Sequence, residues 1–230
     1  MKKKVFLGLL AVIPVFMFLF GTTVNAAPAK DKIRVGWVTS LSGVNAPGVT
    51  VTSGNVYKMW VDEVNAKGGL NIKEYGKRLP LDVTMYDDKS DIGTMTKLFE
   101  KTIVEDKVDL VFCPWDTAFI FAAAPIANKH KMVLLGGSGG ALKLKAIIDK
   151  LPYFFQVLNF ADYQIPALAE VFTEVGVKSV YIAYIQDLHG LEYNEVAQKA
   201  FKEKKINIVA AKSFPLDMQD FTPLLKEAKA

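Results

Sequence analysis

Residues 109–140 read DLVFCPWDTAFIFAAAPIANKHKMVLLGGSGG, and this stretch decides the fold. Asp109–Cys113 is strand-like, residues 117–129 form an apolar stretch of helical length, and residues 132–135 are entirely apolar, as in a buried strand. A strand, a helix and a second strand in this order predict a parallel βαβ unit with a right-handed crossover.

The same alternation precedes this stretch. Residues 33–39 are β-branched and largely apolar, and residues 51–67 place apolar side chains on one helical face. Residues 79–86 alternate like a strand, and residues 91–107 return to helical spacing. The resulting βαβαβαβ order predicts a parallel sheet with helices on both faces, which we assign to a first lobe over residues 27–150.

A second set of elements follows an irregular stretch at residues 149–162. The pattern predicts helix 163–175, strand 179–185, helix 191–204, strand 206–214 and a helix beginning at Phe221. Two strands and a partial third unit make too thin a sheet to bury both faces. We therefore expect an α/β protein with two doubly wound parallel-sheet lobes, of which the second, residues 151–230, is incomplete.

The N-terminus has the pattern of a signal peptide. Lys2–Lys4 form a positive region, Val5–Phe20 carries no charge, and Val24 and Ala26 place small side chains before a cleavage site. We expect residues 1–26 to be removed after Ala26, which places the product in the periplasm. An uncleaved membrane anchor is the alternative, but the apolar run is short for a membrane span. No cysteine lies near the cleavage site, so a lipid anchor at the new N-terminus is not expected.

Composition excludes several classes of function. The formal net charge of +4 includes Lys2–Lys4, so the exported chain carries about +1 and has no basic tail that would indicate a nucleic-acid partner. Cys113 is the only cysteine, which rules out an intramolecular disulfide or a cysteine-based metal site. The sequence predicts neither a metal nor a cofactor.

Open parallel sheets bind ligands at the carboxyl ends of their strands. Four loops occupy that position: residues 40–50, 114–117, 136–140 and 186–190. Hydroxyl groups in these loops can donate hydrogen bonds to a ligand. The same residue types also favour helix N-caps and turns for purely structural reasons.

Five motifs in these regions resemble those of a known family. They are VTSLSGVNAPG (38–48), VNAKGGL (64–70), YDDKSD (86–91), FCPWDTAFIFAAAPIA (112–127) and LLGGSGG (134–140). In order and spacing, residues 31–230 resemble the Leu/Ile/Val-type, or branched-chain amino acid type, periplasmic substrate-binding proteins of ABC transporters. The resemblance implies the periplasmic binding protein type I fold and a C-terminally truncated chain. It also implies that a branched-chain amino acid, or a similar small polar amino acid or amide, is captured between two lobes and passed to a membrane permease.

The resemblance also assigns binding residues. The hydroxyl that holds the ligand carboxylate falls at Thr117, and the second binding turn falls at Ser138, Gly139 and Gly140. An aromatic residue of the second lobe falls at His189, which can donate a hydrogen bond but titrates near neutral pH.

Two further positions leave alternatives open. Trp115 either stacks on the ligand or covers the sheet core. Asp116 stands where family members carry a small neutral residue, and its carboxylate would repel a ligand carboxylate unless a cation is paired with it. Pro47-Gly48 replaces an aromatic-glycine pair. The identity of the solute therefore stays open.

The alternative function is that of an enzyme. Gly136–Gly140 matches the G-x-S-x-G turn of a serine hydrolase, with Ser138 as nucleophile and His189 as the only downstream histidine. Asp187, two residues before it, shares its loop, whereas the acid and base of such enzymes come from separate loops. A dinucleotide enzyme is disfavoured because G-x-G-x-x-G spacing is absent.

Asp87-Asp88 is expected to cap the helix from Asp91 rather than to bind metal.

Overall fold

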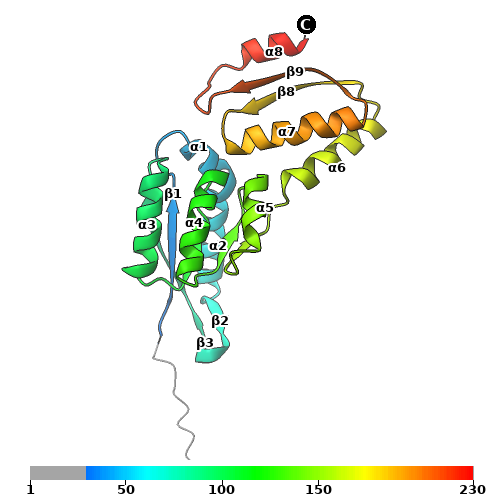
Figure 1. Ribbon diagram of the computed structural model, residues 1–230. Coiled ribbons are helices and arrows are strands. Elements are labelled where there is room, and N and C mark those ends of the chain that lie inside the picture. The colour runs from blue at the N-terminus through cyan, green and yellow to red at the C-terminus, as the bar shows by residue number, and fades with distance from the viewer. Residues whose placement is uncertain (1–29, 230) are drawn as a thin grey trace, which may run out of the picture.

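The computed structural model describes residues 30–229. The predicted signal peptide, residues 1–26, and its cleavage site lie outside the described residues. Within residues 30–229, none of the helices combines the length and the apolar character that a membrane crossing requires. Figure 1 shows two layered lobes, the first built from β1 to β7 with α1 to α5, the second from α6 to α8 with β8 and β9.

The first lobe is built around β1 (Ile33–Thr39), which lies between β4 (Leu81–Asp87) and β5 (Leu110–Phe112). Both pairings are parallel. A second parallel pair, β6 (Leu134–Gly136) with β7 (Phe154–Gln156), continues beside β5. The parallel α/β sheet predicted from the sequence is confirmed.

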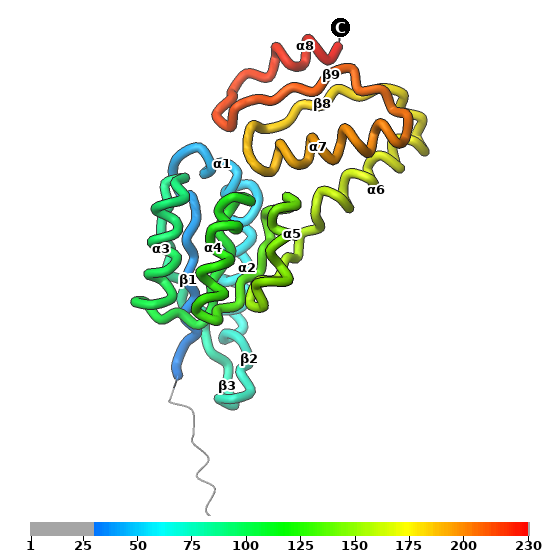
Figure 2. Tube along the Cα trace, viewed as in Figure 1, coloured from blue at the N-terminus to red at the C-terminus, as the bar shows by residue number. Residues whose placement is uncertain are grey.

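Helices cover both faces of β1 (Figure 2). On one face Val38 packs with α3 (Ile92–Val104) and α4 (Thr117–Lys129) in the main core cluster. On the other face Val35 packs with α2 (Asn55–Ala66). This alternation along β1 follows from the two-residue period of a strand, and it explains why the strand is almost entirely apolar.

The boundaries of the elements agree with the sequence pattern where the apolar run is long. Helix α4 and strand β8 (Ser179–Ile185) occupy the predicted residues. The first helical segment begins earlier than expected, with α1 (Ala46–Val49) and a π-helical stretch at Thr50–Gly54 before α2. Pro47 lies in the first turn of α1, where a missing N–H leaves no hydrogen bond unmade.

Several short elements are absent from the sequence prediction. Strands β2 (Leu70–Ile72) and β3 (Lys77–Leu79) form an antiparallel hairpin around a 3₁₀ turn at Lys73–Tyr75. The predicted strand 79–86 is therefore divided at Pro80. Helix α5 (Leu142–Ile148) follows the glycine-rich turn. Strand β7 was also missed, because an element of three residues is too short to show a period.

The second lobe contains α6 (Ala161–Glu174), β8, α7 (Leu188–Glu203), β9 (Asn207–Phe214) and α8 (Thr222–Lys229). Strands β8 and β9 pair in parallel, and Figure 1 shows α6 and α7 on one side of this pair and α8 on the other. Although β7 falls within residues 151–230, it pairs with β6 of the first lobe. The exact lobe boundary stays a prediction.

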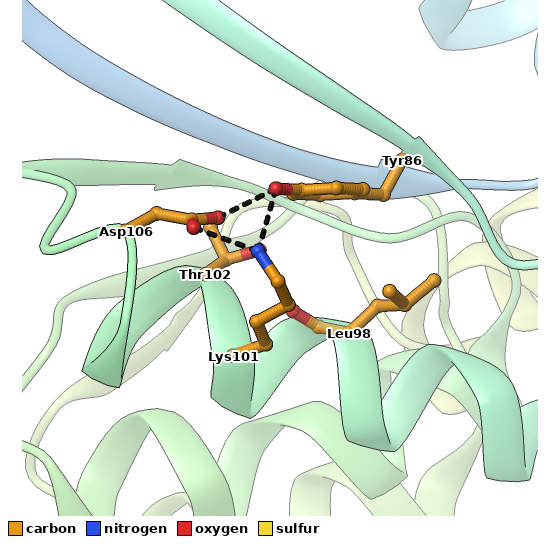
Figure 3. A network of polar contacts seen from close by, with 5 residues as sticks. All are labelled: Tyr86, Leu98, Lys101, Thr102 and Asp106. Atoms are coloured by element: carbon orange, nitrogen blue, oxygen red, sulfur yellow. Dashed lines mark hydrogen bonds and ion pairs between the residues drawn. The ribbon is translucent and has the colours of Figure 1, made fainter.

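A polar network fastens α3 to the edge strand β4 (Figure 3). The Lys101 ammonium donates to Tyr86 Oη at 2.8 Å and to Asp106 Oδ1 at 2.7 Å, and Tyr86 Oη donates to Asp106 Oδ2 at 2.8 Å. These bonds raise the pKa of Lys101, the bond to Asp106 contributing most. The network holds the C-terminal end of α3 and so supports the sheet that carries the binding loops.

Candidate functional site

The loop after β1 is held by two adjacent carboxylates at the end of β4. Asp87 accepts hydrogen bonds from the Ser42 N–H at 3.2 Å and the Ser42 hydroxyl at 2.6 Å. Asp88 accepts from the Ser40 hydroxyl at 2.6 Å, and burial raises the pKa of Asp88. The pair therefore fixes the first of the four predicted loops.

The expectation that Asp87-Asp88 caps the following helix is wrong. Asp91 is the N-cap of α3, and its carboxylate accepts a hydrogen bond from the Thr94 N–H at 2.6 Å. Asp87 and Asp88 instead bond backward to the loop of the neighbouring strand, because β1 and β4 are adjacent and parallel. Sequence spacing alone does not reveal such a contact.

Asp116 is the N-cap of α4. Its carboxylate accepts from the Ala118 N–H at 2.9 Å, and its backbone has φ 83° and ψ 148°, a region that residues other than glycine rarely occupy. Burial raises the pKa of Asp116 to about 6, and the negative charge of Asp187, from the second lobe, adds to the increase. The N-cap carboxylates of α4 and α7 are thus near enough for the charge of Asp187 to act on Asp116.

Thr117 joins the lobes directly. Its side chain is buried, and its Oγ1 lies 3.4 Å from Nδ1 of His189 in the first turn of α7. Figure 1 shows the start of α4 beside the start of α7, and the two helices are in contact. Two positions 72 residues apart, both predicted to bind ligand, therefore lie within hydrogen-bonding distance of each other.

Gly139 lies against Thr117. A Cβ atom at residue 139 would lie 2.9 Å from the Thr117 Cα and 3.1 Å from its Oγ1. Because such a contact with backbone is too short, only glycine fits here. The loop after β6 therefore approaches the start of α4 as closely as the backbone allows.

Ser138 is placed in the same loop by a contact of 3.4 Å from its hydroxyl to the Pro114 carbonyl oxygen. The His189 imidazole is paired with Thr117 and not with Ser138. Ser138 is also not among the described residues with positive φ, so its backbone lacks the strained conformation of a hydrolase nucleophile turn. This geometry does not support the hydrolase reading.

Gly140 meets the second lobe. A Cβ atom there would lie 2.2 Å from the Tyr193 hydroxyl oxygen and 3.0 Å from the Asn159 carbonyl oxygen. The Tyr193 ring stacks on His189, with ring centroids 4.0 Å apart. Sequence reasoning missed Tyr193, because the predicted helix began at residue 191 and left His189 in a loop. Helix α7 begins at Leu188, so two residues four positions apart lie on one helical face.

Trp115 lies on α1. A Cβ atom at Gly48 would lie 2.3 Å from the Trp115 Cη2 atom, so the indole ring packs directly on the glycine backbone. This contact connects the loop after β5 to the loop after β1 and requires glycine at residue 48. Stacking of Trp115 on a ligand stays a prediction.

His189 is held by the start of α7. Asp187 is the N-cap, accepting from the Gly190 N–H at 2.7 Å. Burial lowers the pKa of His189, although Asp187 and Glu192 oppose the change, so the neutral imidazole is favoured. A neutral imidazole can either donate or accept a hydrogen bond at the face between the lobes.

The four loops thus connect to one another at the carboxyl ends of the strands. Two helix N-termini, one serine hydroxyl, one threonine hydroxyl and one imidazole gather where the lobes meet. Among residues 30–229, no group of three histidine, cysteine or carboxylate side chains is arranged to hold a metal ion. The arrangement suits recognition of a small polar molecule by hydrogen bonds.

The family described as periplasmic binding protein matches residues 32–230, and the chain belongs to this family. Its fold is the periplasmic binding protein type I fold, with α/β lobes built on parallel sheets. The resemblance seen in the loop motifs is confirmed at the level of the family.

Two solved structures illustrate the likeness. A solute-binding protein of an ABC transporter from Rhodopseudomonas palustris, in complex with 4-hydroxybenzoate, is 24% identical with a TM-score of 0.68, over 86% of this chain and 51% of that one. The branched-chain amino acid transporter substrate-binding protein LivJ from Streptococcus pneumoniae, in complex with isoleucine, is 23% identical with a TM-score of 0.68, over 87% and 54%. The chain spans about half the length of these proteins.

Proposed function

We propose that this protein is the extracytoplasmic solute receptor of an ABC importer. In this proposal it captures a small polar solute of the amino acid or amide type between its lobes and delivers it to a membrane permease. The observation that carries the proposal is the contact at 3.4 Å between Thr117 Oγ1 and His189 Nδ1, which brings together groups from both lobes. Family membership supports the same function.

Each predicted binding residue has a role in this proposal. Thr117 and Ser138 supply hydroxyl donors, and the glycines at residues 139 and 140 leave room for the solute to reach backbone N–H groups. Gly140 is crowded by Tyr193 of the second lobe, so the solute would reach its N–H only as the lobes separate. His189 then completes the site from the second lobe.

Capture follows from closure of the lobes. Thr117 belongs to the first lobe and His189 to the second. A solute can contact both side chains at once only when the lobes are closed, so such a solute stabilises the closed state. Binding therefore shifts the population toward the closed form, which is the form a permease can distinguish from the empty receptor. No covalent bond is broken, and neither a metal nor a cofactor takes part in the proposal.

Export belongs to the same proposal. A receptor that serves an importer has to work outside the cytoplasm, and residues 1–26 have the pattern of a signal peptide cleaved after Ala26. The mass of the exported protein measures this directly, with Ala27 expected as its first residue. A retained N-terminus would contradict the predicted cleavage.

The test uses the protein over its whole natural length. Its thermal unfolding is measured with isoleucine, 4-hydroxybenzoate and a small amide, and at least one of these is expected to raise Tm in a concentration-dependent way. Thr117→Ala should weaken that solute at least tenfold. Thr96→Ala is the matched control, because the Thr96 hydroxyl bonds only within α3, to the Ile92 carbonyl oxygen, on an exposed surface. Unchanged binding in Thr117→Ala would place the site elsewhere, and no response to any solute would contradict the receptor function.

A further inference from the structure

The Tyr193 hydroxyl occupies the side-chain position of Gly140 in the predicted binding turn. A Cβ atom at residue 140 would collide with the Tyr193 hydroxyl oxygen, so the phenol reaches the backbone of this glycine. Tyr193 lies in α7 of the second lobe, whereas Gly140 follows β6 of the first. The turn has no side chain of its own at residue 140, and the other lobe brings a hydroxyl group to the same place.

The backbone of this turn offers donors to a bound molecule. Gly139 and Gly140 are buried, and their carbonyl oxygens accept from the segment that connects the lobes. The Gly140 oxygen accepts from the Ala161 N–H at 2.9 Å, and the Gly139 oxygen accepts from the Gln156 side-chain amide. Within residues 30–229, neither glycine donates a hydrogen bond through its N–H group. Buried N–H groups are nearly always paired in folded proteins, so these two are suited to a solute acceptor.

The direction of one of these donors follows from peptide geometry. In a planar trans peptide, the C=O and the next N–H point to opposite sides. The Gly139 carbonyl points to Gln156 in the connecting segment, and the described chain contains no cis peptide bond. The Gly140 N–H therefore points away from the connecting segment.

The Tyr193 hydroxyl is held as a donor beside this turn. The Tyr193 ring stacks on His189 with ring centroids 4.0 Å apart and planes inclined by 27°, which fixes the direction of the hydroxyl. Burial raises the pKa of Tyr193 above its ordinary value, and a hydrogen bond with the Gln164 side chain opposes this increase only in part. The phenol is therefore neutral at physiological pH and can donate its hydrogen to an acceptor.

Resting on the receptor function proposed above, we propose that Tyr193 is a solute-binding residue whose hydroxyl donates to the same solute oxygen as the Gly140 N–H. A carbonyl or carboxylate oxygen has two lone pairs and can accept both hydrogen bonds. Because the two donors come from different lobes, this oxygen is held by both only when the lobes are closed. The paired contact therefore favours the closed, liganded state.

Tyr193→Phe tests the hydroxyl, because it keeps the ring that stacks on His189. The protein over its whole natural length is titrated by calorimetry at pH 7 with isoleucine, 4-hydroxybenzoate and acetamide. Tyr193→Phe should weaken the solute that the wild type binds most tightly by about fivefold or more, since the closed state loses one hydrogen bond to it. Tyr163→Phe is the matched control, because it makes the same change on a ring of the second lobe that is 68% exposed.

Dissociation kinetics separate a bond to the solute from packing between the lobes. Tyr193 reaches the solute only on closure, so loss of its hydroxyl should raise the dissociation rate by about the same factor and leave the association rate nearly unchanged. Thermal unfolding of the empty Tyr193→Phe protein should give a Tm close to that of the wild type. A lowered Tm with unchanged affinity would assign the hydroxyl to packing alone and overturn the proposal.

A second pair of variants moves the hydroxyl to the other lobe. With Tyr193→Ala, a Cβ atom at residue 140 no longer meets the phenol, although the Asn159 carbonyl oxygen stays 3.0 Å away. In this background, Gly140→Ser and Gly140→Ala differ only in a hydroxyl near the place that the phenol leaves. The serine variant should bind the solute about fivefold more tightly than the alanine variant. With Tyr193 present, either substitution should weaken binding by about tenfold or more, because the new Cβ prevents full closure.

The outcomes separate this inference from the receptor function. If the wild type binds a solute and Tyr193→Phe binds it equally well, Tyr193 is not a solute-binding residue, while the receptor function stands. An equal loss in Tyr163→Phe overturns the role of Tyr193 in the same way, as does equal affinity of the serine and alanine variants at residue 140. If the wild type binds none of the three solutes, the receptor function fails, and the role of Tyr193 fails with it.

Discussion

Strands β1 and β8 each contain seven residues and each pairs in parallel, yet β1 buries six of its residues and β8 buries none fully. The difference lies in their neighbours. Strand β1 has a strand on either side and helices on both faces, whereas β8 pairs with β9 alone within the described residues. A parallel strand reaches full burial only when the surrounding layers are present.

The comparison extends to the two cores. The main cluster of the first lobe contains large, almost completely buried side chains, such as Phe99, Phe154 and Leu134. The cluster of the second lobe is smaller and includes three alanines with Phe201 and Ile206. Apolar burial is the main source of stability, so the first lobe should hold most of it and act as the fixed platform for the binding loops.

A matched pair of substitutions tests this difference most strongly. Phe99 is 1% exposed and Phe201 is 4% exposed, so both lose a buried ring on change to alanine. Phe99→Ala should cost about 3–5 kcal/mol of unfolding free energy, because a packed surrounding cannot close the cavity. Phe201→Ala, in the thinner second lobe, should cost at least about 1 kcal/mol less, because its surroundings can collapse. Urea unfolding measures both, and equal costs would remove the distinction between the lobes.

The binding loop after β6 offers a second test of the rigid platform. Gly139→Ala should cost about 1–3 kcal/mol, because the new Cβ meets the Thr117 backbone, and it should also weaken any bound solute. Gly137→Ala is the control in the same loop. Its Cβ would have only the Tyr57 hydroxyl oxygen nearby, at 3.6 Å, so its cost should stay within about 0.5 kcal/mol. Similar losses of unfolding free energy in the two variants would show that the loop can shift to accommodate the new Cβ atom, which would contradict a rigid platform.

The smallest expected effect lies at the face between the lobes. The pKa of Asp116 is raised from 3.8 to about 6, so the folded protein holds this proton more tightly than the unfolded chain. Stability contributed by protonated Asp116 is therefore present below about pH 4 and lost as pH rises through 6, by about 1–2 kcal/mol after allowance for solvent screening. Urea unfolding of the wild type and Asp116→Asn across this range measures the difference. Parallel pH profiles would mean that Asp116 is less buried than the closed arrangement implies.

Much of the fold is predictable from local pattern. Helix α4 and strand β8 begin and end at the predicted residues, because long periodic or apolar runs show their structure clearly. The hairpin β2–β3 and strand β7 were missed, since each is too short to show a period. Strand β7 is defined by its pairing with β6, which is a contact between distant residues.

The candidate site divides in the same way. Its position at the carboxyl ends of the strands follows from the order of elements. The motifs named Thr117, Ser138 and His189, which lie in loops that meet between the lobes, and their binding of a solute stays a prediction. Tyr193 and the effect of the Asp187 charge on Asp116 escaped prediction, as did the backward bonds of Asp87 and Asp88 to the loop after β1.

The sequence alone therefore determined the alternating elements, the parallel sheet and the loops that carry polar groups, because these depend on residues close together along the chain. Only the tertiary structure decided which groups meet. The Thr117–His189 contact and the approach of Gly140 to Tyr193 each connect the two lobes. Such contacts depend on how two separately packed layers face each other, and no local pattern of residues encodes that geometry.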